Sequence, residues 1–238
     1  MRAIILAGGK GTRLRPYTVV LPKPLMPIGE YPILEVIVRQ LVHHGFTHIT
    51  MAVNYQAKII QSFFGDGSQW GITIDYSLET RPLGTMGPLR LLEDLPEQFL
   101  VMNGDILTDF DYGSFFSHHV QSGSIFTIAS FERELRSEYG VLKVNADGKL
   151  CGFEEKPTYV FEVSTGIYML HRNVVQHIPD DTPYGFDTLM LDLIAAGNPA
   201  SVYRHTGYWL DIGRSEDYQQ AVDEFEKSAA LFLKGLPK

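Results

Sequence analysis

Residues 2–13 read RAIILAGGKGTR, an apolar run followed at once by a loop that contains three glycines. The run over 2–7 is short, which predicts a buried strand of a parallel sheet. The glycines predict a tight loop whose backbone can come close to a ligand and whose amide groups can donate hydrogen bonds to phosphate oxygens. Because a structural tight turn gives the same pattern, this loop alone does not establish a phosphate site.

Strand and helix patterns alternate along the chain beyond this loop. In the first half, strands are predicted at 49–53, 72–76 and 99–102, and helices at 32–44, 58–64 and 87–92. This order indicates a parallel sheet with helices on both faces, and ligands of such sheets bind at the carboxyl ends of the strands. Gly8, Asn54 and Asp105 each lie just past a predicted strand, so we expect them to share one cleft.

The second half has a more mixed pattern. Strands are predicted at 124–130, 141–144, 150–154 and 163–170, and helices at 187–195 and 215–227. The turn sequence NADG at 145–148 predicts an antiparallel hairpin, and Ser215 is expected to cap the last helix. We therefore expect one domain over 1–238 in the α/β class, with a doubly wound, mostly parallel mixed sheet, helices on both faces and antiparallel additions in the second half.

The composition is that of a globular protein. Of the 238 residues, 45% are hydrophobic and 20% are charged, and the mean hydropathy is −0.04. No apolar run approaches the roughly 20 residues that span a bilayer, and no leader pattern opens the sequence, so we expect no membrane association and a cytoplasmic location. The net charge of −8 argues against nucleic-acid binding. The single cysteine, Cys151, excludes an internal disulfide and a cysteine-rich zinc site.

Two cations accompany the glycine loop. Arg13 ends it, and Lys23 lies ten residues further on between Pro22 and Pro24, which restrict the local backbone and fix the direction of the lysine. Two such cations beside a glycine loop suit a triphosphate or pyrophosphate. The loop matches neither the dinucleotide-binding fingerprint, whose third glycine is replaced by Leu14, nor the Walker pattern.

The loop belongs to the first of several short sequence blocks that extend along the chain to residue 213. They are LAGGKGTRLRP (6–16), PKP (22–24), AVNY (52–55), ETRPLGT (79–85), NGD (103–105), YG (139–140), EEKP (154–157), TG (165–166) and WLDIG (209–213). Together they closely resemble the signature of the sugar-1-phosphate nucleotidyltransferases, most of all the mannose-1-phosphate guanylyltransferase branch. The resemblance implies a Rossmann-like nucleotidyltransferase fold, here a catalytic core without the C-terminal left-handed β-helix that this branch often carries.

The resemblance also implies roles for individual residues. Arg13 and Lys23 would be catalytic and would neutralise charge on the triphosphate, and Asp105 and Asp211 would hold Mg²⁺. The nucleotide would be bound by Leu6, Ala7, Gly8, Gly9, Gly11, Thr12, Arg13, Lys23, Gly84, Thr85 and Asn103. The sugar phosphate would be bound by Gly140, Glu155, Lys156, Thr165 and Gly166. The part that binds the nucleoside triphosphate (NTP) would span about 1–110, and the part that binds the sugar phosphate about 111–238.

The expected reaction moves a nucleotidyl group from an NTP to a sugar 1-phosphate and releases pyrophosphate. The first choice of substrates is GTP with mannose 1-phosphate or a heptose 1-phosphate. Gly104, where many of these guanylyltransferases have serine, and the thymidylyltransferase-like Ser164-Thr165-Gly166 keep UTP, dTTP and CTP as alternatives. A non-catalytic regulatory subunit that binds a nucleotide sugar is a rival hypothesis. A dinucleotide-dependent oxidoreductase is a weaker one, because of Leu14, and a homo-oligomer is left open.

Overall fold

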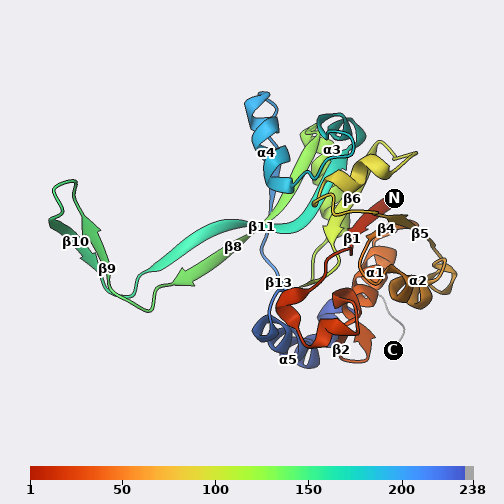
Figure 1. The fold of residues 1–238 in the computed structure, drawn as a ribbon, viewed down its shortest axis with the longest axis horizontal. Coiled ribbons are helices and arrows are strands. Elements are labelled where there is room, and N and C mark those ends of the chain that lie inside the picture. Colours follow the sequence, from red (N-terminus) through yellow and green to blue (C-terminus); the bar gives the residue numbers. More distant parts are fainter. Residues whose placement is uncertain (234–238) are drawn as a thin grey trace.

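The computed structural model describes residues 1–233 and is built around one seven-stranded sheet (Figure 1). Its strands, in spatial order, are β12 (Ser201–His205), β8 (Phe126–Arg136), β11 (Thr158–His171), β6 (Gln98–Asn103), β1 (Arg2–Leu6), β4 (His48–Val53) and β5 (Thr73–Leu78). Strands β6, β1, β4 and β5 are parallel, whereas β11 runs antiparallel to both of its neighbours. The predicted mostly parallel mixed sheet with antiparallel additions is confirmed.

Three antiparallel strand pairs supplement this sheet. They are β2 (Pro27–Ile28) with β3 (Tyr31–Pro32), β7 (Ile106–Thr108) with β13 (Trp209–Asp211), and β9 (Val141–Val144) with β10 (Leu150–Glu154). The last pair is the hairpin predicted from the turn at 145–148. Its turn is closed by a hydrogen bond from the Gly148 amide to the Asn145 carbonyl at 3.0 Å, with Gly148 at φ +77°.

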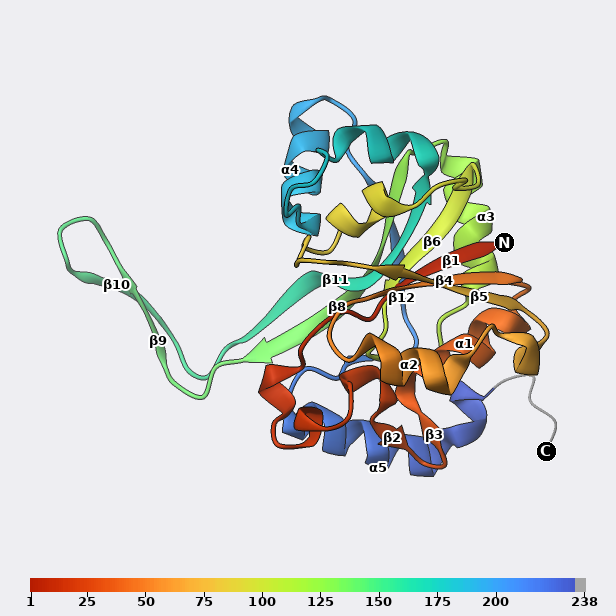
Figure 2. The ribbon, with the colours of Figure 1, turned by 45° about the vertical axis from the view of Figure 1, so that its right-hand side comes forward.

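Helices cover both faces of the sheet, as predicted (Figure 2). The α-helices are α1 (Ile33–His43), α2 (Ala57–Phe64), α3 (Tyr112–Ser122), α4 (Phe186–Ala195) and α5 (Ser215–Phe232). The 3-10 turns are η1 (Thr12–Leu14), η2 (Tyr17–Val19), η3 (Lys23–Leu25), η4 (Ser68–Trp70), η5 (Gly87–Leu91) and η6 (Arg172–His177). None of the helices within residues 1–233 combines the length and the apolar character needed to cross a membrane.

The alternation of side chains along β1 explains why its sequence is apolar throughout. Ile5 belongs to a buried cluster with Ile37 of α1, on the face that α1, α2 and α5 cover. Ile4 points to the opposite face and belongs to a second cluster with Leu89 of η5 and Leu189 of α4. A strand buried on both faces has no position for a polar residue, so it appears in sequence as a continuous apolar run.

Some element boundaries differ from the predictions. Pro32 is in an extended conformation and precedes helix α1 instead of forming its first turn. Helix α5 is capped one residue earlier than expected, because the Asp217 carboxylate accepts the Arg214 amide hydrogen at 2.8 Å. Strands β8 and β11 continue well past the predicted 124–130 and 163–170. Their outer halves lie beyond the core, where charged residues stand among the apolar ones, so they lack the continuous apolar run that marks a buried strand.

The outer halves of β8 and β11 leave the body as a two-stranded ribbon, which ends in the β9–β10 hairpin (Figures 1 and 2). We call residues 132–163 the arm. The pairing along the ribbon stays in register from Ser130 opposite Ser164 to Arg136 opposite Thr158.

Candidate functional site

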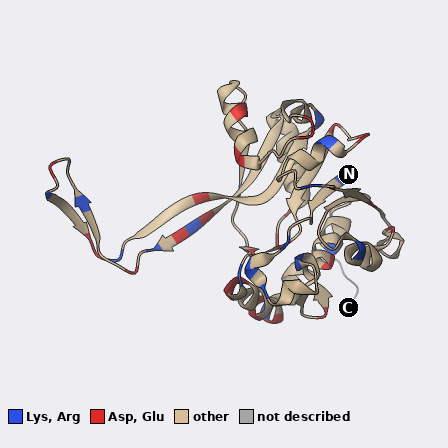
Figure 3. Cartoon of the chain, in the orientation of Figure 1, with Lys and Arg blue, Asp and Glu red and all other residues tan. Residues whose placement is uncertain are grey.

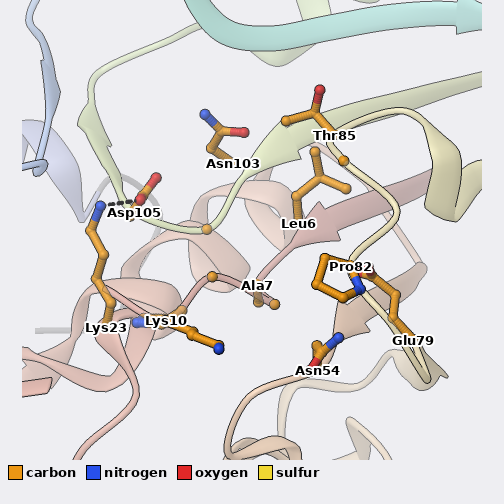
Figure 4. Close-up of a pocket in the computed structure, with 15 residues that line it drawn as sticks. Leu6, Ala7, Lys10, Lys23, Asn54, Glu79, Pro82, Thr85, Asn103 and Asp105 are labelled. Carbon is orange, nitrogen blue, oxygen red and sulfur yellow. Dashed lines mark hydrogen bonds and ion pairs between the residues drawn. The ribbon is translucent and has the colours of Figure 1, made fainter. Parts of the chain in front are cut away.

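A pocket of about 420 Å³ lies at the carboxyl ends of β1, β4 and β6 (Figure 4). Gly8, Asn54 and Asp105 all line it, so the predicted shared cleft is confirmed. The complete set of lining residues is Leu6, Ala7, Gly8, Gly9, Lys10, Lys23, Pro24, Asn54, Glu79, Pro82, Gly84, Thr85, Asn103, Gly104 and Asp105. The pocket therefore contains eight of the eleven residues expected to bind the nucleotide; Gly11, Thr12 and Arg13 lie outside its lining.

The glycine loop presents backbone to this pocket. Gly9 is exposed, and a Cβ atom placed on it would meet nothing within 4 Å, so the space beside this residue is open. Gly11 adopts φ +58°, and a Cβ there would lie 2.9 Å from the Cγ2 atom of Thr18. The Thr18 hydroxyl donates to the Gly11 carbonyl at 2.7 Å and holds the turn closed. A residue other than glycine at position 11 would be strained by both its dihedral angle and its neighbour.

Lys23 is aimed at the pocket, as the flanking prolines predict. Pro22 is extended, and η3 begins at Lys23. Lys23 is only 9% exposed. Its Nζ atom donates to Oδ2 of Asp105, which follows β6 (Figure 4). The two residues are 82 positions apart in sequence, so this ion pair ties the glycine-loop region to the end of β6.

Asp105 and Asp211 lie next to each other although they are far apart in sequence. Asp211 ends β13, which pairs with β7 and places Asp211 opposite Ile106. The amide of Ile212 donates to the Asp105 carbonyl at 3.1 Å. Burial, and then the nearby charge of Asp105, raise the pKa of Asp211, while Lys23 and Arg13 act in the opposite direction. Two neighbouring carboxylates in a poorly solvated place are the source of this shift.

The oxygen atoms of this pair fit a hard cation. The Oδ1 atom of Asp105 is buried and has no hydrogen-bond partner, so one carboxylate oxygen is available for coordination. Within residues 1–233 no group of three or more Asp, Glu, His or Cys side chains could hold a metal by itself. Mg²⁺ at a nucleotide site is usually bound by one or two carboxylates, and phosphate oxygens and water complete its coordination.

Arg13 lies beside the carboxylate pair. A Cβ atom on Gly213 would be 3.3 Å from Nη1 of Arg13 and 3.4 Å from Oδ2 of Asp211, so both side chains border the same glycine. Arg13 is exposed, which leaves its guanidinium free to meet a phosphate at this edge of the pocket.

The opposite wall of the pocket is held by the contact between the segment around residue 84 and α4. Gly84 has φ +78°, and a Cβ on it would come within 2.6 Å of the Tyr184 carbonyl oxygen. The Thr85 hydroxyl accepts the Phe186 amide hydrogen at 2.7 Å. These contacts bring Gly84 and Thr85, which the resemblance assigns to nucleotide binding, to the rim of the pocket.

The five residues expected to bind the sugar phosphate fall into two groups. Thr165 and Gly166 lie at the base of the arm beside the pocket. A Cβ on Gly166 would be 2.5 Å from Nδ2 of Asn103, and the buried Thr165 hydroxyl donates to the Ala129 carbonyl at 2.8 Å. The Trp209 indole donates to the Thr165 carbonyl at 2.9 Å and fixes this segment against β13.

Gly140, Glu155 and Lys156 lie instead on the arm, where the ribbon meets the hairpin. A Cβ on Gly140 would be 2.7 Å from the Phe153 ring and 3.0 Å from Oε2 of Glu155, so these residues are neighbours. All three are exposed, and none of them lines the pocket. One chain therefore does not bring its two groups of predicted sugar-phosphate residues together (Figures 1 and 2).

Comparison with known proteins agrees with this geometry. A profile of the nucleotidyl transferase family matches residues 2–228. The chain belongs to this family. It is 36% identical over 242 residues to a UTP–glucose-1-phosphate uridylyltransferase of Synechocystis, which covers 93% of this chain and 62% of that protein. It is 34% identical over 247 residues to a mannose-1-phosphate guanyltransferase of Yarrowia lipolytica, covering 100% of this chain and 66% of that protein. The chain thus spans less than two thirds of the length of either relative.

Solved structures show the same fold. HddC from Yersinia pseudotuberculosis, which has also been solved with GMP-PN, matches with a TM-score of 0.72 at 27% identity, covering 94% of this chain and 99% of that chain. A Bacillus anthracis chain matches with a TM-score of 0.77 at 24% identity, covering 100% of this chain and 97% of that chain, which speaks for the fold alone. The predicted resemblance to sugar-1-phosphate nucleotidyltransferases is confirmed.

Several residues of this pocket were not assigned a role from the sequence. Lys10, Pro24, Asn54, Glu79 and Pro82 all line it. Burial raises the pKa of Glu79, although its carboxylate accepts the Leu83 amide hydrogen at 3.2 Å. Glu79 directly follows β5, so the strand-end rule that singled out Asn54 could also have found it.

Proposed function

We propose that this protein transfers a nucleotidyl group from an NTP to a sugar 1-phosphate. The observation that carries the proposal is the meeting of the glycine loop, the buried Lys23–Asp105 ion pair and Asp211 at one edge of the sheet. Membership of the nucleotidyl transferase family supports the same reaction.

In this reaction a phosphate oxygen of the sugar 1-phosphate attacks the α-phosphorus of the NTP. The bond from that phosphorus to the bridging oxygen of the β-phosphate breaks, and pyrophosphate leaves with its electron pair. Because the attacking phosphate is already ionised, no protein base has to remove a proton. Catalysis then depends on alignment of the two phosphates and neutralisation of their charge.

Each part of the site has a role in this scheme. The peptide groups around the exposed Gly9 donate to the phosphates of the NTP, and the guanidinium of Arg13 meets the charge that develops on the leaving pyrophosphate. Lys23 lies at the same phosphates while its pairing with Asp105 holds it in place. Asp105 and Asp211 would hold Mg²⁺, which when bound supplies further neutralisation of phosphate charge.

GTP, with mannose 1-phosphate or a heptose 1-phosphate, is the substrate pair we propose first. Mannose-1-phosphate guanyltransferases recur among the similar proteins, and HddC was solved with the guanine nucleotide GMP-PN. UTP with glucose 1-phosphate is the second candidate, favoured by the 36% identity to the Synechocystis uridylyltransferase. We further propose one domain, with NTP binding in about 1–110 and sugar-phosphate binding in about 111–238.

The experiment is a pyrophosphate-release assay with GTP, UTP, dTTP and CTP, each against a panel of sugar 1-phosphates and in the presence of Mg²⁺. The proposal is supported if pyrophosphate release requires both substrates. Release should also be lost in the Arg13→Ala variant, which should remain folded. Binding of a nucleotide sugar without turnover of any pair would instead indicate a regulatory subunit.

A further inference from the structure

Strand pairing and ring packing hold the base of the arm against the body. Strand β8 is continuous from Phe126 to Arg136, and β12 pairs with it as far as His205 opposite Phe131. The Phe131 ring also packs on the Trp209 ring, with centroids 5.5 Å apart. The register shift of β11 falls between Ser164 and Tyr168, a stretch whose partner β8 is held by β12 on its other side.

Ion pairs reinforce the same base. The Arg204 guanidinium of β12 pairs with Glu162 on β11, and it lies 3.8 Å from the Glu132 carboxylate on β8. The Ser130 hydroxyl donates to Glu162 as well. A rotation of the whole arm about its base would break the contacts of Arg204 with Glu132 and Glu162.

The arm carries exposed apolar surface that suits a protein interface. Nine of the 21 exposed large hydrophobic side chains in residues 1–233 lie between positions 135 and 161. Four opposed or alternating side chains share one face of the hairpin, and three more share one face of the ribbon. These seven are Leu142, Val144, Leu150 and Phe153, and Leu135, Tyr159 and Phe161.

The area of these faces approaches that of a stable interface. Aromatic side chains such as the three among these seven have about 150–250 Å² each, and with the four Leu and Val side chains, all at 37–63% exposure, the two faces offer on the order of 700 Å². A standard interface buries about 800 Å² on each partner. In addition, an isolated two-stranded hairpin is only marginally stable in water, so the β9–β10 pair gains from a surface to pack on.

The charged residues on the arm indicate which partner its apolar faces bind. Under the proposed function, on which this step rests, Gly140, Glu155 and Lys156 contact a sugar phosphate, yet they belong to the arm and none of them lines the pocket. Acidic and basic side chains alternate along the arm (Figure 3). Because neither sign of charge dominates, the arm does not repel a second copy of the chain. A second copy of the chain offers a pocket of the right kind, and two copies can exchange arms symmetrically.

We infer that two copies of this chain exchange arms, so that Glu155 and Lys156 of each copy complete the sugar-phosphate end of the other copy's pocket. Each site is then composed of a glycine loop, Lys23 and the carboxylate pair from one chain, and the arm tip from its partner. A chain without a partner would keep its NTP pocket and lack the acceptor side.

The first test measures mass and does not depend on activity. Light scattering should give twice the chain mass of 26.8 kDa for the unaltered protein. The double variant Leu142→Asp/Phe153→Asp, which alters an opposed pair on the hairpin, should give the monomer mass. Leu191→Asp, at a 67% exposed position on α4, is the matched control and should remain a dimer. Circular dichroism verifies that each variant is folded. A monomeric unaltered protein would overturn the inference.

The second test shows where the acceptor residues act. Arg13→Ala spoils the pocket and leaves the arm intact, whereas Lys156→Ala spoils the arm and leaves the pocket intact. The heterodimer, isolated through two different affinity tags, contains one complete site if arms are exchanged, and should recover about half of the unaltered dimer's turnover. Recovery no greater than that of either variant alone means that each arm serves its own chain, which overturns the inference. If the unaltered protein turns over no substrate pair, the proposed function fails, while the mass measurement still judges the exchange of arms.

Discussion

Replacing Lys23 by methionine tests the charged core of the site. Methionine preserves most of the side-chain volume and removes the ammonium that neutralises Asp105. The side chains of Lys23 and Asp105 are 10% and 22% exposed, and Oδ1 of Asp105 already lacks a hydrogen-bond partner. In the variant, the largely buried carboxylate of Asp105 therefore lies next to Asp211 without its ammonium partner.

The magnitude follows from this burial. Removing one partner of a fully buried ion pair costs about 3–5 kcal/mol, and the partial exposure of Asp105 reduces the expected loss of unfolding free energy to about 2–3 kcal/mol. For a domain of this size, that loss corresponds to a fall in Tm of roughly 4–12 °C. Loss of a phosphate contact in the transition state should lower kcat/KM by about 100-fold or more.

The assay combines thermal unfolding at neutral pH, without nucleotide or metal, with pyrophosphate release. Lys58→Met, at an exposed position on α2, is the control and should change stability by less than about 0.5 kcal/mol. The double variant Lys23→Met/Asp105→Asn removes the unpaired charge as well, so it should regain much of the lost stability and none of the activity. A Lys23→Met protein as stable as the unaltered one would refute the buried ion pair.

Three further predictions follow from the same site. Arg13→Ala, at an exposed position, should change Tm little and reduce turnover by about 100-fold or more; near-normal turnover in the folded variant would reject its assignment. Because the folded-state pKa of Asp211 is raised, ionisation of this carboxylate opposes folding, so Asp211→Asn should raise the metal-free Tm at pH 7 while it lowers turnover. That gain should disappear below the ordinary pKa of 3.8, and a pH-independent difference in Tm would contradict it. Lys156→Ala should raise the KM for the sugar phosphate and leave NTP affinity intact in a titration; an equal loss of NTP affinity would argue against its role.

Local patterns were sufficient to predict one side of the pocket. The glycine loop follows a strand that must be apolar because both of its faces are buried, and the prolines beside Lys23 restrict its direction. The rule that strands of a parallel sheet end at a common edge placed Gly8, Asn54 and Asp105 together before the fold was known. These inferences required only residue spacing and the direction of the strands.

Long-range pairing determined what local sequence patterns could not predict. Asp211 meets Asp105 through the ladder between β7 and β13, two strands of only three residues each, and nothing local to either strand specifies that pairing. The raised pKa of Asp211 depends on the same contact. The course of the arm was equally hidden, because the hairpin at 145–148 can be predicted without any information on where the hairpin packs.

The account rests on transfer of the nucleotidyl group itself, and the most direct measurement follows the α-phosphate. GTP labelled at the α-phosphorus is incubated with mannose 1-phosphate, heptose 1-phosphate and Mg²⁺ in separate reactions, and the same is done with labelled UTP and glucose 1-phosphate. The account predicts that the label appears in a nucleotide sugar, in equal amount to the pyrophosphate released, and only when the sugar phosphate is present. Label found in GMP, GDP or UDP irrespective of the sugar phosphate, or retained in unreacted NTP in every reaction, would contradict it.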